Sequence, residues 1–294
     1  MNRRFEVHVP LHEFRWRGER WNVAPGILVE RRKEPVSLHR RESELGESER
    51  RTLKEDVTHW LSFTVDGIGR CTSAEVMNLV LLALWLVKPT RVHACFRFKF
   101  GVDDADGETT VFRLLDRFQW IDGAVDERFE DDDLQEASRL FATMQQIDRA
   151  GRLNNGLVLT LDGCFQHRWQ SALALFAAAA ESLLTYSNSR GLTRRLANSY
   201  AILVGVEEPS RDEGFDEFVG CYRVRSDVVH GRSALVPASE RLPFLIRWQR
   251  LLRRLWRRVL GDPAALSALE GSDAMREEFF RAKIAGNQSA AALS

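Results

Sequence analysis

Residues 215 to 231, FDEFVGCYRVRSDVVHG, decide the fold of the C-terminal half of the chain. At about 100° per residue, a helix would place five apolar side chains of this stretch on one face: Phe218, Cys221, Tyr222, Val228 and Val229. Arg225 falls within that apolar stripe, whereas Arg223 lies off it and is an ordinary surface charge. Because a guanidinium stays charged near neutral pH, a buried Arg225 needs a partner or a function.

His230 is expected at the C-terminal end of this helix. It lies five residues after Arg225, about 140° around the helix, and Gly231 follows at once. Glycine is the usual residue just beyond a helix C-terminus. Although the two side chains are not stacked on one face, the long Arg225 side chain can reach the edge of a cleft that His230 also borders. The alternative for His230 is a helix-terminal residue that bonds the last carbonyls.

A second helix is predicted around Glu181, the only charged residue between Ala172 and Thr185. Such an apolar helix should be central, and its carboxylate should be paired. The candidate partners are Arg225, Arg194 and Arg195. An ion pair between Glu181 and Arg225 that fixes helix register is the alternative to a catalytic role for Arg225.

Residues 222 to 231 resemble the terminal signature of Apea-like HEPN domains, in which an arginine, four residues and a histidine close a helix before glycine. The upstream pattern fits as well. Glu181-Ser182-Leu183-Leu184 lies in a hydrophobic helix, and Arg194-Arg195-Leu196-Ala197 opens the next one. The resemblance covers roughly residues 155 to 260. The first half resembles only the loosely defined N-terminal regions that accompany such domains.

The resemblance implies a helical bundle that dimerises and brings two Arg–His pairs into one cleft. Arg225 and His230 would be catalytic in RNA cleavage without metal or other cofactor, leaving a 2′,3′-cyclic phosphate. The supporting residues would be Glu181, Ser226, Asp227 and Tyr222. Many active members have an amide or acid where this chain has Ser226, although serine is familiar in the Apea-like branch. Asp227 either orients His230 or is a solvated charge.

The same resemblance implies a biological setting. It predicts a cytoplasmic homodimer that damages RNA, with tRNA among the candidate substrates, in bacterial abortive infection against phage. The N-terminal region would sense a phage-derived trigger or restrain the nuclease. A second hypothesis is a catalytically inactive HEPN scaffold that binds a partner protein or nucleotide. A third, a DNA-binding protein, is disfavoured because no helix-turn-helix signature accompanies the arginines.

A further candidate for RNA contact is residues 241 to 258, which include seven arginines and no acid. One side of this helix would present five of them: Arg247, Arg250, Arg254, Arg257 and Arg258. RNA phosphates are natural partners for such a stripe. The alternative is a solvated face, or one paired with the acidic residues 126 to 133.

The predicted fold class is α+β, with a mixed α/β region over residues 1–130 followed by a helical domain over 131–294. Strand-like runs occur at residues 26–29, 57–65, 91–100 and 109–115, and a buried helix is expected at 73–87 with Ser73 as its N-cap. Residues 40 to 56 are so rich in charge that a solvated loop or exposed helix is expected. Later helices are expected at 133–150, 167–187, 192–204, 212–230, 239–260 and 274–284. Asp131 to Asp133 favour a helix start over a metal site, because adjacent side chains do not converge on one ion.

Composition and missing motifs exclude several classes. The 42 basic and 42 acidic residues cancel, so attraction to nucleic acid must come from a local patch. No apolar run approaches the roughly 20 residues that cross a bilayer, and the start does not match a secretory signal. The four scattered cysteines suit reduced thiols in a cytoplasm. There is no phosphate-binding loop, dinucleotide fingerprint, zinc-finger spacing or hydrolase elbow.

Overall fold

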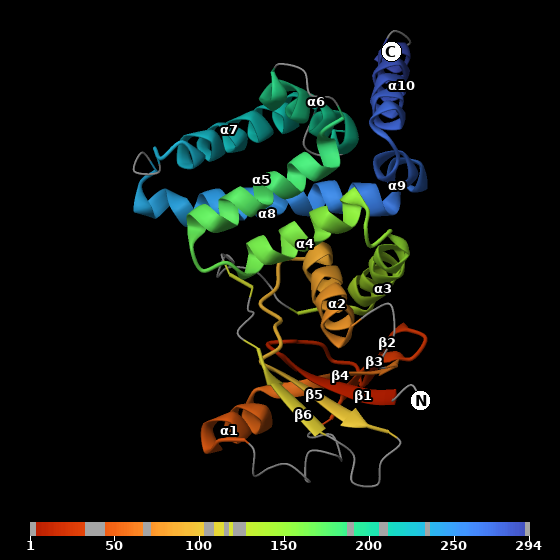
Figure 1. Ribbon diagram of the computed structural model, residues 1–294, viewed down its shortest axis with the longest axis vertical. Helices are drawn as coiled ribbons and strands as arrows, with labels where there is room; N and C mark the ends of the chain where they lie inside the picture. Colours follow the sequence, from red (N-terminus) through yellow and green to blue (C-terminus); the bar gives the residue numbers. More distant parts are fainter. Residues whose placement is uncertain are drawn as a thin grey trace. The chain divides into compact units, whose positions relative to one another are not determined.

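The computed structural model describes residues 4–32, 45–66, 72–102, 109–114, 118–119, 128–186, 191–205, 211–232 and 236–291 (Figure 1). The chain forms two compact units, Met1–Gln145 and Gln146–Ser294. Helix α3 (Asp131–Gln146) belongs almost entirely to the first unit, so the units divide later than the predicted boundary at residue 130. Its Ser138 hydroxyl accepts a hydrogen bond from Trp21 Nε1 at 2.9 Å, which joins it to a strand of that unit.

The first unit is built on an antiparallel sheet. Among the described residues, six strands pair in the order β2-β3-β4-β1-β5-β6. Their bounds are β1 (Arg4–His12), β2 (Arg20–Ala24), β3 (Ile27–Arg31), β4 (Val57–Asp66), β5 (Phe96–Gly101) and β6 (Thr109–Arg113). The predicted strand-like runs correspond to β3, β4, β5 and β6, although residue 115 lies outside the described residues. The α+β class is confirmed, with the sheet preceding the helices.

Strand β1 was missed by the sequence analysis although it is central, between β4 and β5. Its second half is buried on both faces, with Val7, Val9 and Leu11 alternating with His8 and His12. Residues 5 to 12 alternate between apolar and other side chains, so a period-2 signal for this strand was present in the sequence. The pattern could not indicate that the face with His8 and His12 is buried as well.

In the described part of the first unit, two helices accompany the sheet besides α3. Helix α1 (Glu47–Glu55) occupies part of the charged segment 40–56, of which residues 40–44 lie outside the described residues. Helix α2 (Ser73–Val87) has the predicted bounds and is buried on most sides. Its N-cap is Thr72, one residue before the predicted Ser73. The Thr72 hydroxyl accepts from the Glu75 N–H at 3.3 Å and the Glu75 carboxylate accepts from the Thr72 N–H at 2.6 Å, a capping box.

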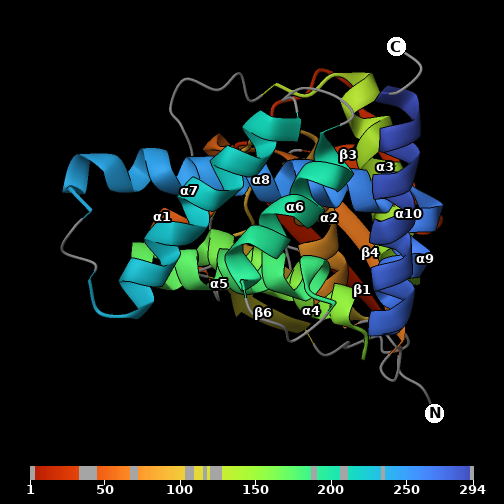
Figure 2. The same ribbon diagram turned by 90° about the horizontal axis from the view of Figure 1, so that it is seen from above.

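The second unit is helical. Its elements are α4 (Arg152–Phe165), α5 (Trp169–Leu184), α6 (Leu192–Val204), α7 (Arg211–Val229), α8 (Ala238–Gly261), α9 (Pro263–Glu270) and α10 (Asp273–Ala291). Helix α5 contacts α4, α6, α7 and α8, which confirms the central position predicted for the helix of Glu181 (Figure 2). None of the helices in the described part of the chain is both long and apolar enough to cross a membrane.

Helix α4 was not predicted, and its packing explains why. It includes glycines, which weaken a helix in isolation. A Cβ at Gly163 would lie 2.6 Å from the Phe176 ring of α5, and one at Gly156 would lie 2.4 Å from Ser182 Oγ and 3.1 Å from Trp256. The glycines therefore permit close approach of α5 and α8. The helix is stabilised by its neighbours rather than by local propensity.

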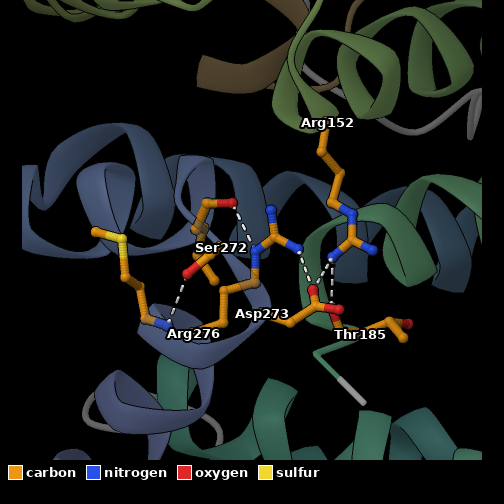
Figure 3. A network of polar contacts seen from close by, with 7 residues as sticks. Arg152, Thr185, Ser272, Asp273 and Arg276 are labelled. Atoms are coloured by element: carbon orange, nitrogen blue, oxygen red, sulfur yellow. Dashed lines mark hydrogen bonds and ion pairs between the residues drawn. The ribbon is translucent and has the colours of Figure 1, made fainter. Parts of the chain in front are cut away.

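A polar network ties the start of α4 to α5 and α10 (Figure 3). Arg152 Nη1 donates to the Thr185 carbonyl at 2.6 Å and forms an ion pair with Asp273 at 3.3 Å. Arg276, only 3% exposed, donates from Nε to the Leu269 carbonyl at 2.8 Å and pairs with Asp273 at 3.1 Å. Asp273 thus neutralises two guanidinium groups where three helix ends meet.

Candidate functional site

Helix α7 presents its predicted apolar face to the bundle over only part of its length. Phe218, Cys221 and Tyr222 are buried. The prediction that the stripe continues to Val229 is wrong, because Val229 is 52% exposed. The C-terminal end of α7 and the N-terminal end of α8 extend beyond their neighbours, at the left of Figures 1 and 2. The last turn of α7 therefore lacks the packing that the middle of the helix has.

Arg225 contacts Glu181 of α5, which is the ion pair that was predicted as the alternative to a catalytic role. Arg225 Nη2 lies 3.2 Å from Glu181 Oε1, and the Tyr222 hydroxyl donates to the same oxygen at 2.5 Å. The guanidinium carbon lies 5.3 Å from the centroid of the Tyr222 ring. Arg225 Nε is buried and has no hydrogen-bond partner among the described residues. Glu181 and Tyr222 thus fix the position of Arg225.

Burial, and next the hydrogen bond to Glu181, raise the pKa of Tyr222. The phenol therefore stays protonated near neutral pH and keeps donating to Glu181. Glu181 accepts from two directions at once, so the three side chains form one small network in which the arginine and the tyrosine are positioned together.

His230 ends α7 in the predicted place. Its N–H donates to the Ser226 carbonyl at 3.1 Å, and Gly231 has a φ of 79°. The Gly231 N–H then donates to the Val228 carbonyl at 3.1 Å, and the Arg232 N–H to the Asp227 carbonyl at 2.7 Å. These two bonds define a Schellman motif. Because the backbone satisfies these carbonyls, the exposed His230 side chain is not needed to cap the helix.

The two other predicted supporting residues have structural contacts. The Asp227 carboxylate forms an ion pair with Arg232 at 2.9 Å. It therefore pairs with the residue that follows the helix end, and no contact with His230 is among those described. Ser226 is half-buried, and its observed contribution is the carbonyl that accepts the His230 N–H.

The arginine stripe on α8 is partly neutralised by α7. Arg250 Nη2 donates to Glu217 Oε1 at 2.6 Å, and Arg254 Nη1 donates to Glu217 Oε2 at 3.3 Å. Arg247 lies over the Phe244 ring at 5.7 Å, and Arg257 is exposed. Glu217 is thus an acidic partner of the stripe, where the sequence analysis had proposed residues 126 to 133.

The acidic residues 126 to 133 have other roles where they are described. Residues 126 and 127 lie outside the described residues. Asp131, Asp132 and Asp133 form the first turn of α3, as expected for acids at a helix start. Asp133 accepts from the Glu130 N–H at 2.9 Å and forms an ion pair with Lys88, and Asp131 accepts from Trp16 Nε1 at 2.9 Å.

Burial, followed by the nearby Arg257 and Arg254, lowers the pKa of Arg253 to about 10. Arg253 therefore remains charged near neutral pH. The neighbouring arginines of α8 therefore repel one another, and the Glu217 carboxylate offsets part of this repulsion.

Within the described residues, three side chains of types that can ligate a metal come together in the sheet unit, and this was not predicted. They are His12, His93 and Cys95, whose ligand atoms all lie within 4.8 Å of one another. The short spacing of His93 and Cys95 was a local signal for two of them, although both residues precede β5 and lie outside its regular strand geometry. His12 belongs to β1, which the pattern analysis did not find. The proximity of His12 to His93 and Cys95 could therefore not be predicted from the sequence pattern.

No family model, curated protein or solved structure matches the chain. The resemblance to Apea-like HEPN domains therefore stays a prediction. It depends on the motif around Arg225 and His230 and on the Glu181 helix packed against it.

Proposed function

We propose that the chain is a metal-independent endoribonuclease of the HEPN type. It would act as a cytoplasmic homodimer in abortive infection, a bacterial defence against phage. The supporting observation is the arrangement on α7, where Arg225 is fixed by Glu181 and Tyr222 and the helix ends at an exposed His230.

In this proposal His230 transfers the protons. An imidazole titrates near neutral pH, so it can accept the proton of a ribose 2′-hydroxyl or donate one to the leaving 5′-oxygen. The 2′-oxygen attacks the adjacent phosphorus as the bond to the 5′-oxygen breaks. The products are a 2′,3′-cyclic phosphate and a 5′-hydroxyl, and no water or metal ion is consumed.

Arg225 would stabilise the charge that develops on the phosphate oxygens. A guanidinium offers five N–H donors in a planar fork, and Glu181 occupies a terminal nitrogen, Nη2. Since contacts with Glu181 and Tyr222 already hold the group, little side-chain freedom is lost when substrate binds.

A second protomer would complete the cleft. Val229 and Leu242 are 52% and 42% exposed, and they lie in the last turn of α7 and the early part of α8. Exposed apolar residues at the extended end of these helices are compatible with coverage by a partner (Figure 1). A symmetric contact there would place two Arg–His pairs at one interface.

RNA, with tRNA as a candidate, would contact the stripe of Arg247, Arg250, Arg254 and Arg257. Because Glu217 neutralises part of this charge, we expect the stripe to contribute less than four unpaired arginines would. The sheet unit would respond to a phage-derived trigger.

One observation favours the inactive scaffold as a second candidate. The contact between Arg225 and Glu181 is the register-fixing ion pair that such a scaffold requires, and it needs no substrate to explain it. The partner would then be a protein or a nucleotide.

The deciding experiment is incubation of the purified chain with total RNA and tRNA in EDTA. Arg225→Ala and His230→Ala should each lower the cleavage rate by a factor of about 10²–10⁴, because each removes a group that acts in the transition state. Arg223→Ala is the matched control, since this exposed arginine of the same helix lies off the apolar stripe.

Cyclic-phosphate ends produced by wild type and Arg223→Ala alone would support the nuclease. Cleavage at wild-type rate by both site variants, or none by any protein with or without phage lysate, would favour the scaffold. Circular dichroism of each variant checks that the helices are intact.

A further inference from the structure

Two histidines of the sheet unit lie opposite each other at the end of β1. The His12 N–H donates to the His93 carbonyl at 2.9 Å, and the His93 N–H donates to the His12 carbonyl at 3.3 Å. Residues paired in this way across antiparallel chains project their side chains to one face. The two rings are stacked, with their centroids 5.2 Å apart. Cys95 lies two residues beyond His93, just before β5, and its thiol is within 4.8 Å of the nearest ligand atoms of both histidines.

The three side chains are close to the spacing of metal ligands. Their ligand atoms all lie within 4.8 Å of one another. Tetrahedral Zn²⁺ with ordinary Zn–N and Zn–S bonds separates its ligand atoms by about 3.3–3.6 Å. Small rotations of the side chains, on the order of 1 Å at the ligand atoms, convert one arrangement into the other. His12 and His93 are only 3% and 6% exposed, so surrounding atoms restrict other rotamers.

His93 also has the orientation that a metal-binding histidine needs. Its Nδ1 lies 2.9 Å from the Arg91 carbonyl oxygen. A carbonyl only accepts hydrogen bonds, so Nδ1 bears the proton and Nε2 keeps the lone pair. A backbone carbonyl bonded to the second ring nitrogen is the usual support of a metal-ligating histidine.

The cluster borders a cavity of about 740 Å³ formed by the sheet unit. The same cavity is lined by four arginines (Arg15, Arg17, Arg31 and Arg128) and two acids (Glu13 and Asp56), and Arg31 is paired with Glu19 at 3.2 Å, so the cationic side chains remain in excess. Glu13, which follows His12 and also lines the cavity, has a φ of 57°, a left-handed conformation that is uncommon for glutamate. Backbone strain of this kind concentrates at binding sites.

We propose that His12, His93 and Cys95 bind one Zn²⁺ whose fourth position opens to this cavity and accepts an anion. Two imidazoles and a thiolate are a ligand set suited to zinc, and three protein ligands leave one position for an exogenous group. The thiol loses its proton on binding, and its negative charge offsets the repulsion from the arginines. The arginines in turn make an anion, such as phosphate, the expected fourth ligand.

This inference is independent of the ribonuclease. The ligands belong to the sheet unit, whereas Arg225 and His230 belong to the helical unit and the proposed cleavage uses no metal. A negative result in one experiment therefore leaves the other unaffected.

The test is metal binding by the full chain, purified under reducing conditions and stripped with EDTA. We expect one Zn²⁺ per chain by elemental analysis after dialysis, and a rise in Tm with added Zn²⁺ because the ion binds the folded state. Substituted Co²⁺ should give tetrahedral ligand-field bands and a thiolate charge-transfer band. Inorganic phosphate should shift the ligand-field bands.

Two matched pairs of variants locate the site. Cys95→Ser should remove the charge-transfer band and lower Zn²⁺ affinity by at least about tenfold, and His12→Ala should lower affinity comparably. Cys221→Ser and His8→Gln, which change a buried cysteine and another buried histidine of β1, should bind like wild type.

Several results would overturn the proposal. They are no zinc retained by wild type, an unchanged charge-transfer band in Cys95→Ser, or X-ray absorption of zinc-loaded wild type without a sulfur ligand. The absorption measurement decides the matter even if a variant fails to fold. Cobalt bands that do not respond to phosphate would overturn the anion as fourth ligand.

Discussion

The sheet unit and the helical unit assemble their polar side chains in different ways. In the sheet unit, His12 and Cys95 come from distant parts of the chain and meet because β register brings them together. In the helical unit, Tyr222, Arg225 and His230 follow one another along a single helix, with Glu181 added from α5. A site on one helix can be predicted from local spacing, whereas a site made by strand pairing requires the topology first.

Close packing at glycines makes the helical unit sensitive to small substitutions. In the helical unit, α4 packs through glycines against α5. Gly163→Ala should lower the free energy of unfolding by about 1–3 kcal/mol, because the new Cβ would lie 2.6 Å from the buried Phe176 ring. Urea denaturation measures this, and hydrogen exchange should show that the loss is confined to the helical unit.

Gly220→Ala in α7 is the matched control, since nothing lies within 4 Å of its added Cβ. There the better helix propensity of alanine should stabilise the chain by up to about 1 kcal/mol. Equal effects of the two substitutions would contradict the packing assigned to α4.

Acidification should act on the sheet unit in particular. Burial lowers the pKa of both His8 and His59 from the ordinary value of 6.5, and for His8 the Glu6 carboxylate opposes part of this shift. The unfolded chain therefore binds these protons at higher pH than the folded chain does. The free energy of unfolding should fall as the pH falls below about 6.5, and should stop falling below the folded pKa values.

Urea midpoints measured from about pH 7.5 to about 5.5 test this, since the window includes the ordinary histidine pKa. The double variant His8→Gln/His59→Gln should show a shallower pH dependence, and the exposed His167→Gln should match wild type. An unchanged slope in the double variant would assign the dependence to other groups.

The smallest effect is expected at the pairing between α7 and α8. Glu217→Gln should change the free energy of unfolding by less than about 1 kcal/mol, because the ion pairs with Arg250 and Arg254 are partly exposed. It should strengthen RNA binding a few-fold, with a steeper dependence on salt, since two guanidinium groups lose their carboxylate. Filter binding at two salt concentrations measures this, and weaker binding than wild type would remove the stripe from the RNA contact.

Local sequence signals predicted individual helices in both units. Helix α6 of the helical unit has the predicted bounds because glycines mark both of its ends, and helix α2 of the sheet unit has them because a capping box marks its start. Helix α4 was missed since its glycines are favourable only against α5 and α8. Strand β1 was missed although its residues alternate with period 2, and the alternation does not indicate that its histidine face is also buried.

The candidate site on α7 was predicted in its residues but not in all of its contacts. The pairing of Arg225 with Glu181 followed from one charge in each of two apolar stretches. The partners of Asp227 and of the α8 arginines did not follow from the sequence, because the positions of Arg232 and Glu217 depend on how α7 ends and on how α7 packs against α8.

Gly231 makes the end of α7 a fixed reference point along the chain. Its φ of 79° ends the helix after His230, so the number of residues from Arg225 to the helix end is fixed by the position of Gly231. One alanine inserted between Arg225 and His230 would rotate the two side chains by about 100° relative to each other while Gly231 still ended the helix. The same alanine inserted after Arg232 would leave their phase unchanged. The number of residues between Arg225 and His230 thus sets the angle between the two side chains, so an insertion there could disrupt the site while both residues are kept.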